Sequence, residues 1–275
     1  MPVESSRPSK RGGNQLGAVT DDMPVELLQI VETGTLDALQ INVRTAQIHA
    51  AVLEKSRYIS AANFTRIHPS DLELLFAEYD AKFFDGRVKA SLGSNPLSFG
   101  LSKRMTSAGG KTASYTDRRS GSRRFEIGVS TTILFGCFHD DDHRPITASG
   151  IVCRDRLDAL QRVVEHELVH LIEMLLWDKS SCSQTRFQSI TWRFFGHTEN
   201  MHQLITPRER AIVKFGIKPG MKVRFRFDGE EHTGIVNRIS KRATVLVEDD
   251  RGQRYTNGKH YAKFYVPVQS LEAVE

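Results

Sequence analysis

Two histidines and a glutamate form the part of the sequence best suited to chemistry. His166, Glu167 and His170 make the pattern His-Glu-x-x-His. On an α-helix, residues i and i+4 lie on one face, so both imidazoles can bind one metal ion. Glu167 lies one position around the helix, where its carboxylate reaches the attacking water instead of the metal. The pattern predicts a zinc-dependent peptidase with Glu167 as the general base. A chance pair of partly buried histidines is the alternative interpretation.

A catalytic zinc site needs a third protein ligand and leaves the fourth position for water. Three downstream residues are candidates: Cys182, His197 and His202. An antiparallel pair of helices favours His197, whereas a turn folded over the site favours Cys182. The competing structural roles are a buried small residue for Cys182 and a helix C-terminal cap for His197. His139 and His143 lie in an Asp-rich stretch that indicates a solvated charged loop.

The motif falls inside the strongest helical pattern of the chain, at residues 155–177. Apolar residues recur there at helical spacing: Leu157, Leu160, Val163, Val164, Leu168, Leu171, Ile172 and Leu175. A second helix is predicted at residues 184–195 and ends at Gly196. Upstream, a helix is predicted at residues 70–84, with Ser70 as its cap.

Strands are predicted at residues 97–101 and 125–129, because both segments are short and apolar or alternating. The Gly- and Ser-rich residues 106–122 between them indicate a hairpin or a loop. Residues 25–62 carry apolar residues at loosely helical spacing, which predicts one or two helices. The polar residues 1–22 are predicted to be disordered.

Composition excludes several classes of protein. The chain has 275 residues, 39% of them hydrophobic and 26% charged, as is ordinary for a globular protein. It contains neither an apolar run long enough to span a membrane nor an apolar segment of the secretory type. The odd, sparse set of cysteines (Cys137, Cys153 and Cys182) is not a disulfide framework and favours the reducing cytoplasm.

The excess positive charge lies at the C-terminal end. The net charge is +5, and residues 207–275 contain 14 Lys and Arg against 9 Asp and Glu. After Pro207 the pattern changes to short alternating strands at residues 222–227, 233–239, 244–248 and 261–266. Basic side chains (Arg224, Arg226, Arg238, Lys241 and Arg242) accompany aromatic ones (Tyr255, Tyr261, Phe264 and Tyr265). This mixture suits single-stranded nucleic acid, and a solvated charged face over an aromatic core is the alternative.

Together, these residues resemble the SprT-like metalloprotease family, which includes bacterial SprT and the DNA–protein crosslink protease Spartan. The resemblance covers residues 72–204, about half of the chain. It rests on the Tyr, double Phe and Gly of residues 75–86, the strand at 97–104 with the small residues 108–110, and the motif helix at 164–170. Phe187 and Gly196 match the start and end of the family's next helix. The C-terminal strands are similar to SH3-like barrels.

One departure from the family concerns the third ligand. The family supplies a His four residues before the position that matches Phe187, and Ser183 stands there. Cys182 lies one residue earlier and can bind zinc as a thiolate. The resemblance therefore places Cys182 ahead of His197 and His202.

The sequence thus predicts an α+β protein with a zincin-like metallopeptidase fold, followed by a small all-β, SH3-like barrel. The expected parts are a disordered N-terminus at 1–22, a helical segment at 23–66, the SprT-like domain at 67–206 and the barrel at 217–275. We expect a cytoplasmic, zinc-dependent endopeptidase whose metal is held by His166, His170 and Cys182. The resemblance implies protein substrates associated with DNA, and the basic barrel is a candidate contact with nucleic acid; no membrane contact is predicted.

Two other functions fit the same residues. One is a non-catalytic, nucleic-acid-associated regulator that keeps a zinc site. The other is a structural zinc protein whose metal is closed by four protein ligands. Three protein ligands with one open position indicate an enzyme, whereas four indicate a structural site.

Overall fold

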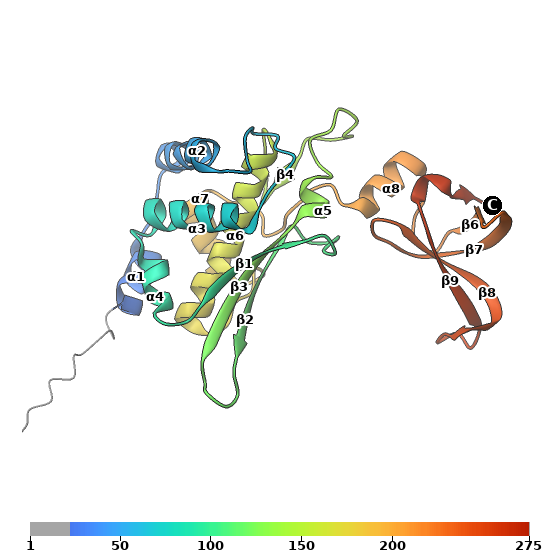
Figure 1. Cartoon of the computed structure of the whole chain (residues 1–275). Helices are drawn as coiled ribbons and strands as arrows, with labels where there is room; N and C mark the ends of the chain where they lie inside the picture. The colour runs from blue at the N-terminus through green and yellow to red at the C-terminus, as the bar shows by residue number, and fades with distance from the viewer. Residues whose placement is uncertain (1–22, 275) are drawn as a thin grey trace, which may run out of the picture.

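The computed structural model describes residues 23–274, so the predicted disordered segment 1–22 lies outside the described residues. Buried apolar side chains form two separate cores, one between Leu27 and Ile205 and one between Ala211 and Leu271. Figure 1 shows the two corresponding units, a larger mixed one and a smaller one made of strands, joined through helix α8 (Pro207–Phe215). The predicted α+β class is confirmed.

The larger unit combines helices with small sheets. Its helices are α1 (Met23–Thr33), α2 (Ala38–Lys55), α3 (Pro69–Phe83), α4 (Arg87–Leu92), α5 (Thr131–Leu134), α6 (Arg156–Trp177) and α7 (Thr185–Phe195). Its strands are β1 (Leu97–Ser102), β2 (Gly110–Thr116), β3 (Arg123–Ser130), β4 (Thr147–Ala148) and β5 (Ile151–Val152). None of the helices within residues 23–274 has the length and apolar character needed to cross a membrane.

Helix α6 is the centre of this unit and confirms the helix predicted at residues 155–177. Asp155 caps its start by accepting a hydrogen bond of 2.8 Å from the amide of Asp158, which satisfies one free N–H of the first turn. The helix ends at Asp178, which adopts a left-handed conformation with φ of 61°. It contacts strands β2 and β3 as well as helices α2, α3 and α7. Two of the three motif residues are buried with it, since His166 and Glu167 are 5% and 2% exposed.

The sheet against α6 has the strand order β1-β3-β2. Strands β1 and β3 are parallel, and β2 and β3 form an antiparallel hairpin. The Gly- and Ser-rich stretch 106–122 therefore includes a strand, as the hairpin interpretation predicted. Phe125, Ile127 and Val129 alternate on β3 and point into the core, which explains the alternation seen in the sequence.

The N-terminal helices belong to the same core as the motif helix. Leu27, Val31, Ile48 and Val52 of α1 and α2 are fully or almost fully buried in it. The cap expected at Ser70 is wrong: α3 is capped instead by His68, whose Nδ1 accepts a hydrogen bond from the Ser70 amide. Pro69 then occupies the first helical position, where its fixed φ and missing N–H are tolerated.

The strands expected directly after Pro207 are preceded by a helix, α8, which the sequence analysis missed. Thr206 caps α8 by accepting a hydrogen bond of 3.1 Å from the Glu209 amide, and Gly216 ends it with φ of 67°. The signal was present, because Thr-Pro-x-Glu is a typical helix start.

The four predicted strands of the C-terminal unit are confirmed, three of them with longer bounds, and the unit has a short fifth strand that was not predicted. They are β6 (Lys222–Phe227), β7 (Glu230–Ile239), β8 (Ala243–Arg254), β9 (His260–Val266) and β10 (Glu272–Ala273), with a short 3-10 helix η1 (Val268–Ser270) before the last. The sheet is antiparallel, in the order β10-β6-β7-β8-β9. Within residues 23–274 the edge strands β9 and β10 do not pair with each other, so the sheet is open and is not closed into the barrel predicted for residues 217–275.

Candidate metal centre

The two motif histidines point toward the same space from neighbouring turns of α6. Their Nε2 atoms are 3.1 Å apart. Two imidazoles that bind one tetrahedral zinc ion at 2.0–2.1 Å place their nitrogens about 3.3 Å apart. His166 and His170 are therefore spaced as two ligands of one ion. Phe187 of α7 supports both rings, with ring centroids 4.8 Å from His166 and 4.4 Å from His170.

Cys182 is the candidate third ligand that the fold brings to these histidines. It lies in the turn between α6 and α7, and that turn lies over the histidines. The ligand atoms of His166, His170 and Cys182 all lie within 4.8 Å of one another. A set of two imidazoles and one thiolate matches the ligand chemistry of zinc.

His197 lies elsewhere, contrary to the prediction from the antiparallel helix pair. It is buried, and its Nε2 donates a hydrogen bond of 2.8 Å to Oε2 of Glu165. Glu165 directly precedes His166, so the two side chains leave the helix about 100° apart. His197 therefore contacts a different face of α6 from the one that carries His166 and His170. This role also differs from the helix-cap alternative.

His202 lies beside the motif but forms a different group. Its ring centroid is 4.4 Å from that of His166. The ligand atoms of His202, His166 and Glu167 lie within 4.8 Å of one another, whereas His170 and Cys182 form a separate group with His166. The Nε2 atom of His202 is buried and has no hydrogen-bond partner among the described residues. His202 is thus available as a further donor near the site.

Glu167 is held against strand β2 in a tight, buried position. A Cβ atom added at Gly110 would lie 2.6 Å from Oε1 of Glu167, so only glycine allows this approach. The hydroxyl of Thr112 lies 2.7 Å from Oε2 of Glu167 and 2.9 Å from its carbonyl oxygen. Burial raises the pKa of Glu167 to about 7, and the hydrogen bonds of Thr112 oppose this shift. A carboxyl group with this pKa can accept and return a proton near neutral pH.

A relay of hydrogen bonds orients His170. Its Nδ1 donates to Oγ of Ser180 at 2.6 Å, and that hydroxyl donates to Oε2 of Glu173 at 2.6 Å. Arg186 completes the chain with a hydrogen bond of 2.7 Å to Oε1 of Glu173. Because Nδ1 holds the proton, Nε2 presents its lone pair to the site. Burial lowers the pKa of His170 to about 4, which keeps the ring neutral, and the charge of Glu173 opposes this shift only partly.

Sequence reasoning missed the residues of this relay and Thr112. For Glu173 the sequence contains a partial signal of this role, since the residue lies three positions after His170 on the same helix. Ser180 and Thr112 have none, because each is a common residue in a loop or strand whose contact depends on the packing of distant segments. The other predicted candidates are placed apart from the motif: His139 bonds to the Phe135 carbonyl and His143 to Glu209.

The site opens into a cavity of about 370 Å³. Its walls come from the start of β2, from α6, from the turn after α6 and from the segment that follows α7. The last of these segments contributes Asn200, Met201 and His202. The cavity is large enough to receive part of a polypeptide, because small-molecule pockets span roughly 300–1,000 Å³. The other two cysteines, Cys137 and Cys153, are buried away from it, and burial raises their pKa values to about 11 and about 12.

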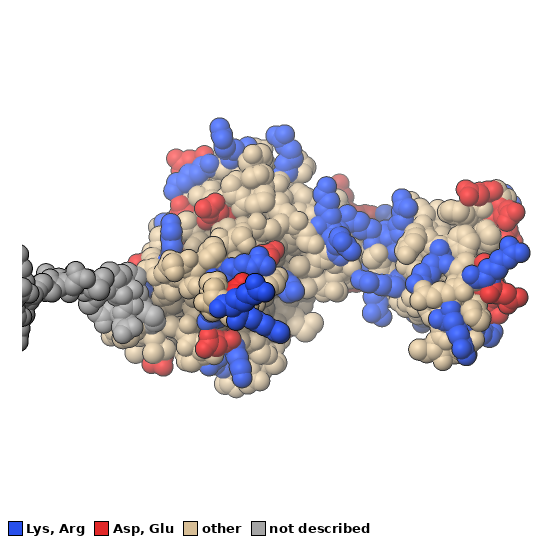
Figure 2. Space-filling model, turned by 60° about the horizontal axis from the view of Figure 1, so that its bottom comes forward, with Lys and Arg blue, Asp and Glu red and all other residues tan. Residues whose placement is uncertain are grey.

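The basic and aromatic residues of the C-terminal unit divide into two groups. Tyr261 is buried in the sheet, and Phe264 packs on Phe225 with ring centroids 5.4 Å apart. Tyr265, in contrast, is 60% exposed. Arg224 pairs with Glu272, whereas no ion pair within residues 23–274 involves Arg226, Arg238, Lys241 or Arg242. Figure 2 shows Lys and Arg side chains gathered where the two units meet.

No family model, no curated protein and no solved structure matches the chain.

Proposed function

We propose that this protein is a zinc-dependent endopeptidase of the SprT-like type. The observation that supports it best is the arrangement on α6: the Nε2 atoms of His166 and His170 face each other at 3.1 Å, next to the buried carboxyl of Glu167. Cys182 is near enough to complete a set of three ligands. All four residues line one cavity.

The donor atoms fit zinc on chemical grounds. One imidazole is already fixed in the tautomer that a ligand needs, with its outer nitrogen bonded to Ser180. The pKa of His166 is also lowered, first by burial and then by the neighbouring histidines, which favours the neutral, ligating form. His166, His170 and Cys182 would hold the ion. When bound, zinc supplies polarisation of a peptide carbonyl and activation of water at neutral pH.

Glu167 is the proposed general base. It accepts a proton from the attacking water and passes it to the leaving amine. Thr112 fixes one carboxylate oxygen of Glu167, and Gly110 leaves the space in which the side chain lies. The turn that contains Cys182 and the segment that contains His202 border the cavity.

The first test is the zinc content of the full chain, purified without chelators, together with peptide hydrolysis of a proteome-derived peptide mixture read by mass spectrometry. We expect one zinc per chain and cleavage that Glu167→Gln lowers about 10²- to 10⁴-fold while the zinc remains. Cys182→Ala should lose both zinc and cleavage. Absence of zinc from the wild-type chain, or unchanged cleavage by the Glu167→Gln variant, would refute the proposal.

A structural zinc site is the second candidate, because His202 lies beside His166 with a buried, unpartnered Nε2. In that case His202 is the fourth ligand and no position remains for water. His202→Ala separates the two functions. The enzyme should keep its zinc in this variant, whereas a four-ligand structural site should lose affinity for it.

The proposal includes two finer points on the C-terminal unit and on the substrate. The open sheet of β6 to β10 supports an SH3-like module, and its exposed basic residues support a contact with nucleic acid. Substrates would then be proteins associated with DNA. A regulator without peptidase activity predicts instead that Glu167→Gln leaves the cellular phenotype intact, so a lost phenotype in that variant excludes it.

A further inference from the structure

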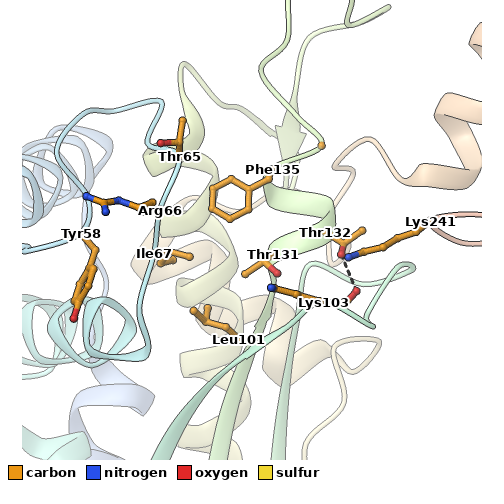
Figure 3. Close-up of a pocket in the computed structure, with 11 residues that line it drawn as sticks. Tyr58, Thr65, Arg66, Ile67, Leu101, Lys103, Thr131, Thr132, Phe135 and Lys241 are labelled. Carbon is orange, nitrogen blue, oxygen red and sulfur yellow. Dashed lines mark hydrogen bonds between the residues drawn. The ribbon is translucent and has the colours of Figure 1, made fainter.

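A second cavity, of about 720 Å³, lies apart from the proposed metal site and shares no lining residue with it. It is bordered by the segment between α2 and α3, by the end of β1 and by α5. Figure 3 shows that Lys241, from the turn between β7 and β8, reaches it from the C-terminal unit. The two units therefore build this cavity together.

The floor of the cavity is apolar. Ile67, Leu101 and Phe135 line it, and each is only partly buried. The ring of Phe135 is fixed from behind by Phe64, in an edge-to-face contact with centroids 5.9 Å apart, and by Arg156, whose guanidinium carbon lies 5.5 Å from the ring centroid. A rigid aromatic ring that faces a cavity is a surface on which a flat ring can stack.

The rim of the cavity is cationic and lacks counter-charges. Arg66, Lys103 and Lys241 line it and are exposed, and its lining contains no Asp or Glu. Within residues 23–274 none of the three forms an ion pair with a carboxylate. Three cations gathered around one opening raise the local concentration of anions.

Hydroxyl groups add acceptors for hydrogen bonds. Thr132 donates its hydroxyl proton to the Lys103 carbonyl at 2.8 Å, and Thr131 donates to the Ser102 carbonyl at 3.3 Å. Since both protons are used, the hydroxyl oxygens retain lone pairs that can accept from a ligand.

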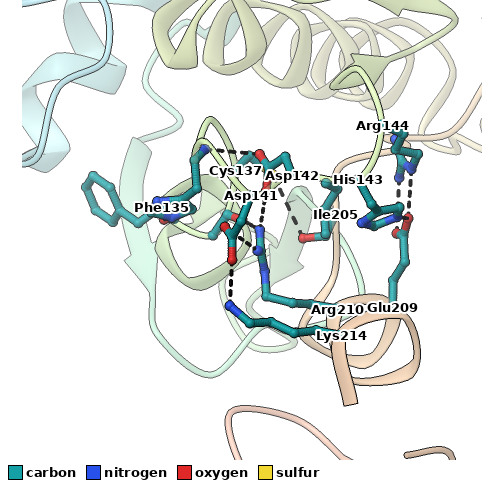
Figure 4. Close-up of polar contacts among 12 residues, drawn as sticks. Phe135, Cys137, Asp141, Asp142, His143, Arg144, Ile205, Glu209, Arg210 and Lys214 are labelled. Atoms are coloured by element: carbon teal, nitrogen blue, oxygen red, sulfur yellow. Dashed lines mark hydrogen bonds and ion pairs between the residues drawn. The ribbon is translucent and has the colours of Figure 1, made fainter. Parts of the chain in front are cut away.

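The position of Lys241 is supported by ion pairs between α8 and the loop after α5, drawn in Figure 4. Arg210 pairs with Asp142, and Glu209 accepts a hydrogen bond of 2.7 Å from Nε of Arg144. On its other side α8 contacts β7, and its residue Ala211 is buried in the C-terminal core. The loop that sequence analysis interpreted as solvated is thus a docking element for the C-terminal unit.

We infer that this cavity binds a nucleoside phosphate. The base would stack on Phe135 over the apolar floor, and the phosphates would lie among Arg66, Lys103 and Lys241. A purely inorganic anion would leave the aromatic floor unused, and a neutral apolar ligand would leave the three cations unpaired. The inference does not depend on the proposed peptidase activity, because the cavities share no residue.

Calorimetric titration of the full chain tests this inference, with adenosine triphosphate, a 12-residue oligothymidylate and inorganic tripolyphosphate as probes. We expect saturable binding of the nucleotide or the oligonucleotide, weakened by salt, and weaker binding of tripolyphosphate. Each of Lys103→Gln and Lys241→Gln should lower the affinity roughly threefold to tenfold. Arg118→Gln, which removes another exposed charge, on the β2–β3 hairpin, is the matched control.

Phe135→Leu tests whether the base stacks on Phe135. This substitution should weaken the binding of the nucleotide and leave the binding of tripolyphosphate unchanged. A thermal unfolding curve checks that this variant is folded. Binding of the mononucleotide identifies a free nucleotide as the ligand, and binding of the oligonucleotide alone identifies a strand. No binding of either, equal binding of tripolyphosphate, or an equal loss in Arg118→Gln would overturn the inference. Because Lys241 is an exposed turn residue, its variant keeps the test valid if Phe135→Leu does not fold.

Discussion

Replacement of His197 by alanine separates the structural histidine from the metal ligands. The side chain of His197 is fully buried, and its Nε2 donates a hydrogen bond of 2.8 Å to Glu165. Glu165 keeps two other partners in the variant: the hydroxyl of Tyr79 at 2.6 Å and the guanidinium of Arg162 at 3.1 Å. The carboxylate therefore loses one contact but is not left unpaired.

The loss of folding stability in this variant follows from these contacts. A buried hydrogen bond to a charged group contributes about 1.5–3 kcal/mol, and the lost imidazole leaves a partly collapsed cavity. We therefore expect His197→Ala to lower the free energy of unfolding by about 2–4 kcal/mol. The zinc content should be unchanged, because the His197 side chain bonds to Glu165 and its nitrogens do not group with the ligand atoms of the motif histidines.

The assay combines two measurements. Urea unfolding in the presence of a chelator gives the stability without the contribution of the metal, and mass spectrometry gives the zinc content of the chain purified without one. Cys182→Ala is the matched control, and we expect the opposite pattern from it: lost zinc and little change in the chelated protein. A folded His197→Ala protein of wild-type stability that has lost its zinc would show that our assignment of both residues is wrong.

Three further predictions concern the surroundings of the site and the docking of the two units. Gly110→Ala should abolish cleavage of the peptide mixture in a chain that still unfolds cooperatively, because the added Cβ would displace the carboxyl of Glu167; activity near the wild-type level would contradict the packing described above. Ser180→Ala should lower zinc affinity about 10- to 100-fold in a competition titration with a chelating dye, since the orienting partner of His170 is lost; an unchanged affinity would show that the relay does not tune the ligand. Burial raises the pKa of Asp142, but the hydrogen bonds from the α8 guanidinium and from a backbone amide outweigh it, so the net pKa is lowered. The ion pair therefore stabilises docking above the unfolded-state pKa of about 3.9 and is lost as the pH falls through the lower folded value. Small-angle scattering should show the units separating in that acidic range, and in Asp142→Asn, which keeps the Arg144–Glu209 pair, the separation should begin at a higher pH; a wild-type profile in this variant would contradict the role of the pair.

Several features of this protein follow from the sequence alone, because they depend on local periodicity. The helix at residues 155–177 and the shared face of His166 and His170 are set by the 3.6-residue repeat. The alternation of β3 and of the C-terminal strands is equally local. The Thr-Pro-x-Glu start of α8 is also a local signal, because it lies within four residues. The prediction of strands after Pro207 overlooked it.

Other features were decided only by the tertiary structure. Cys182 and His197 both follow the motif and were both candidates from the sequence, and the packing of α7 separates them: the turn brings Cys182 to the motif histidines, while His197 contacts Glu165. The spacing of residues along a helix does not reveal which neighbour covers each face. The relay through Ser180 likewise joins segments whose meeting depends on how the whole core packs.

The cavity that includes Lys241 was likewise not predictable from the sequence, because the two units build it together. Nothing near Phe135 in the sequence indicates a lysine more than a hundred residues later, and their proximity follows from the docking of α8. Short-range patterns thus determined the elements and the motif of this protein. Packing between distant segments decided which side chains surround the motif, because the free energy of such contacts depends on shape and burial that no single segment contains.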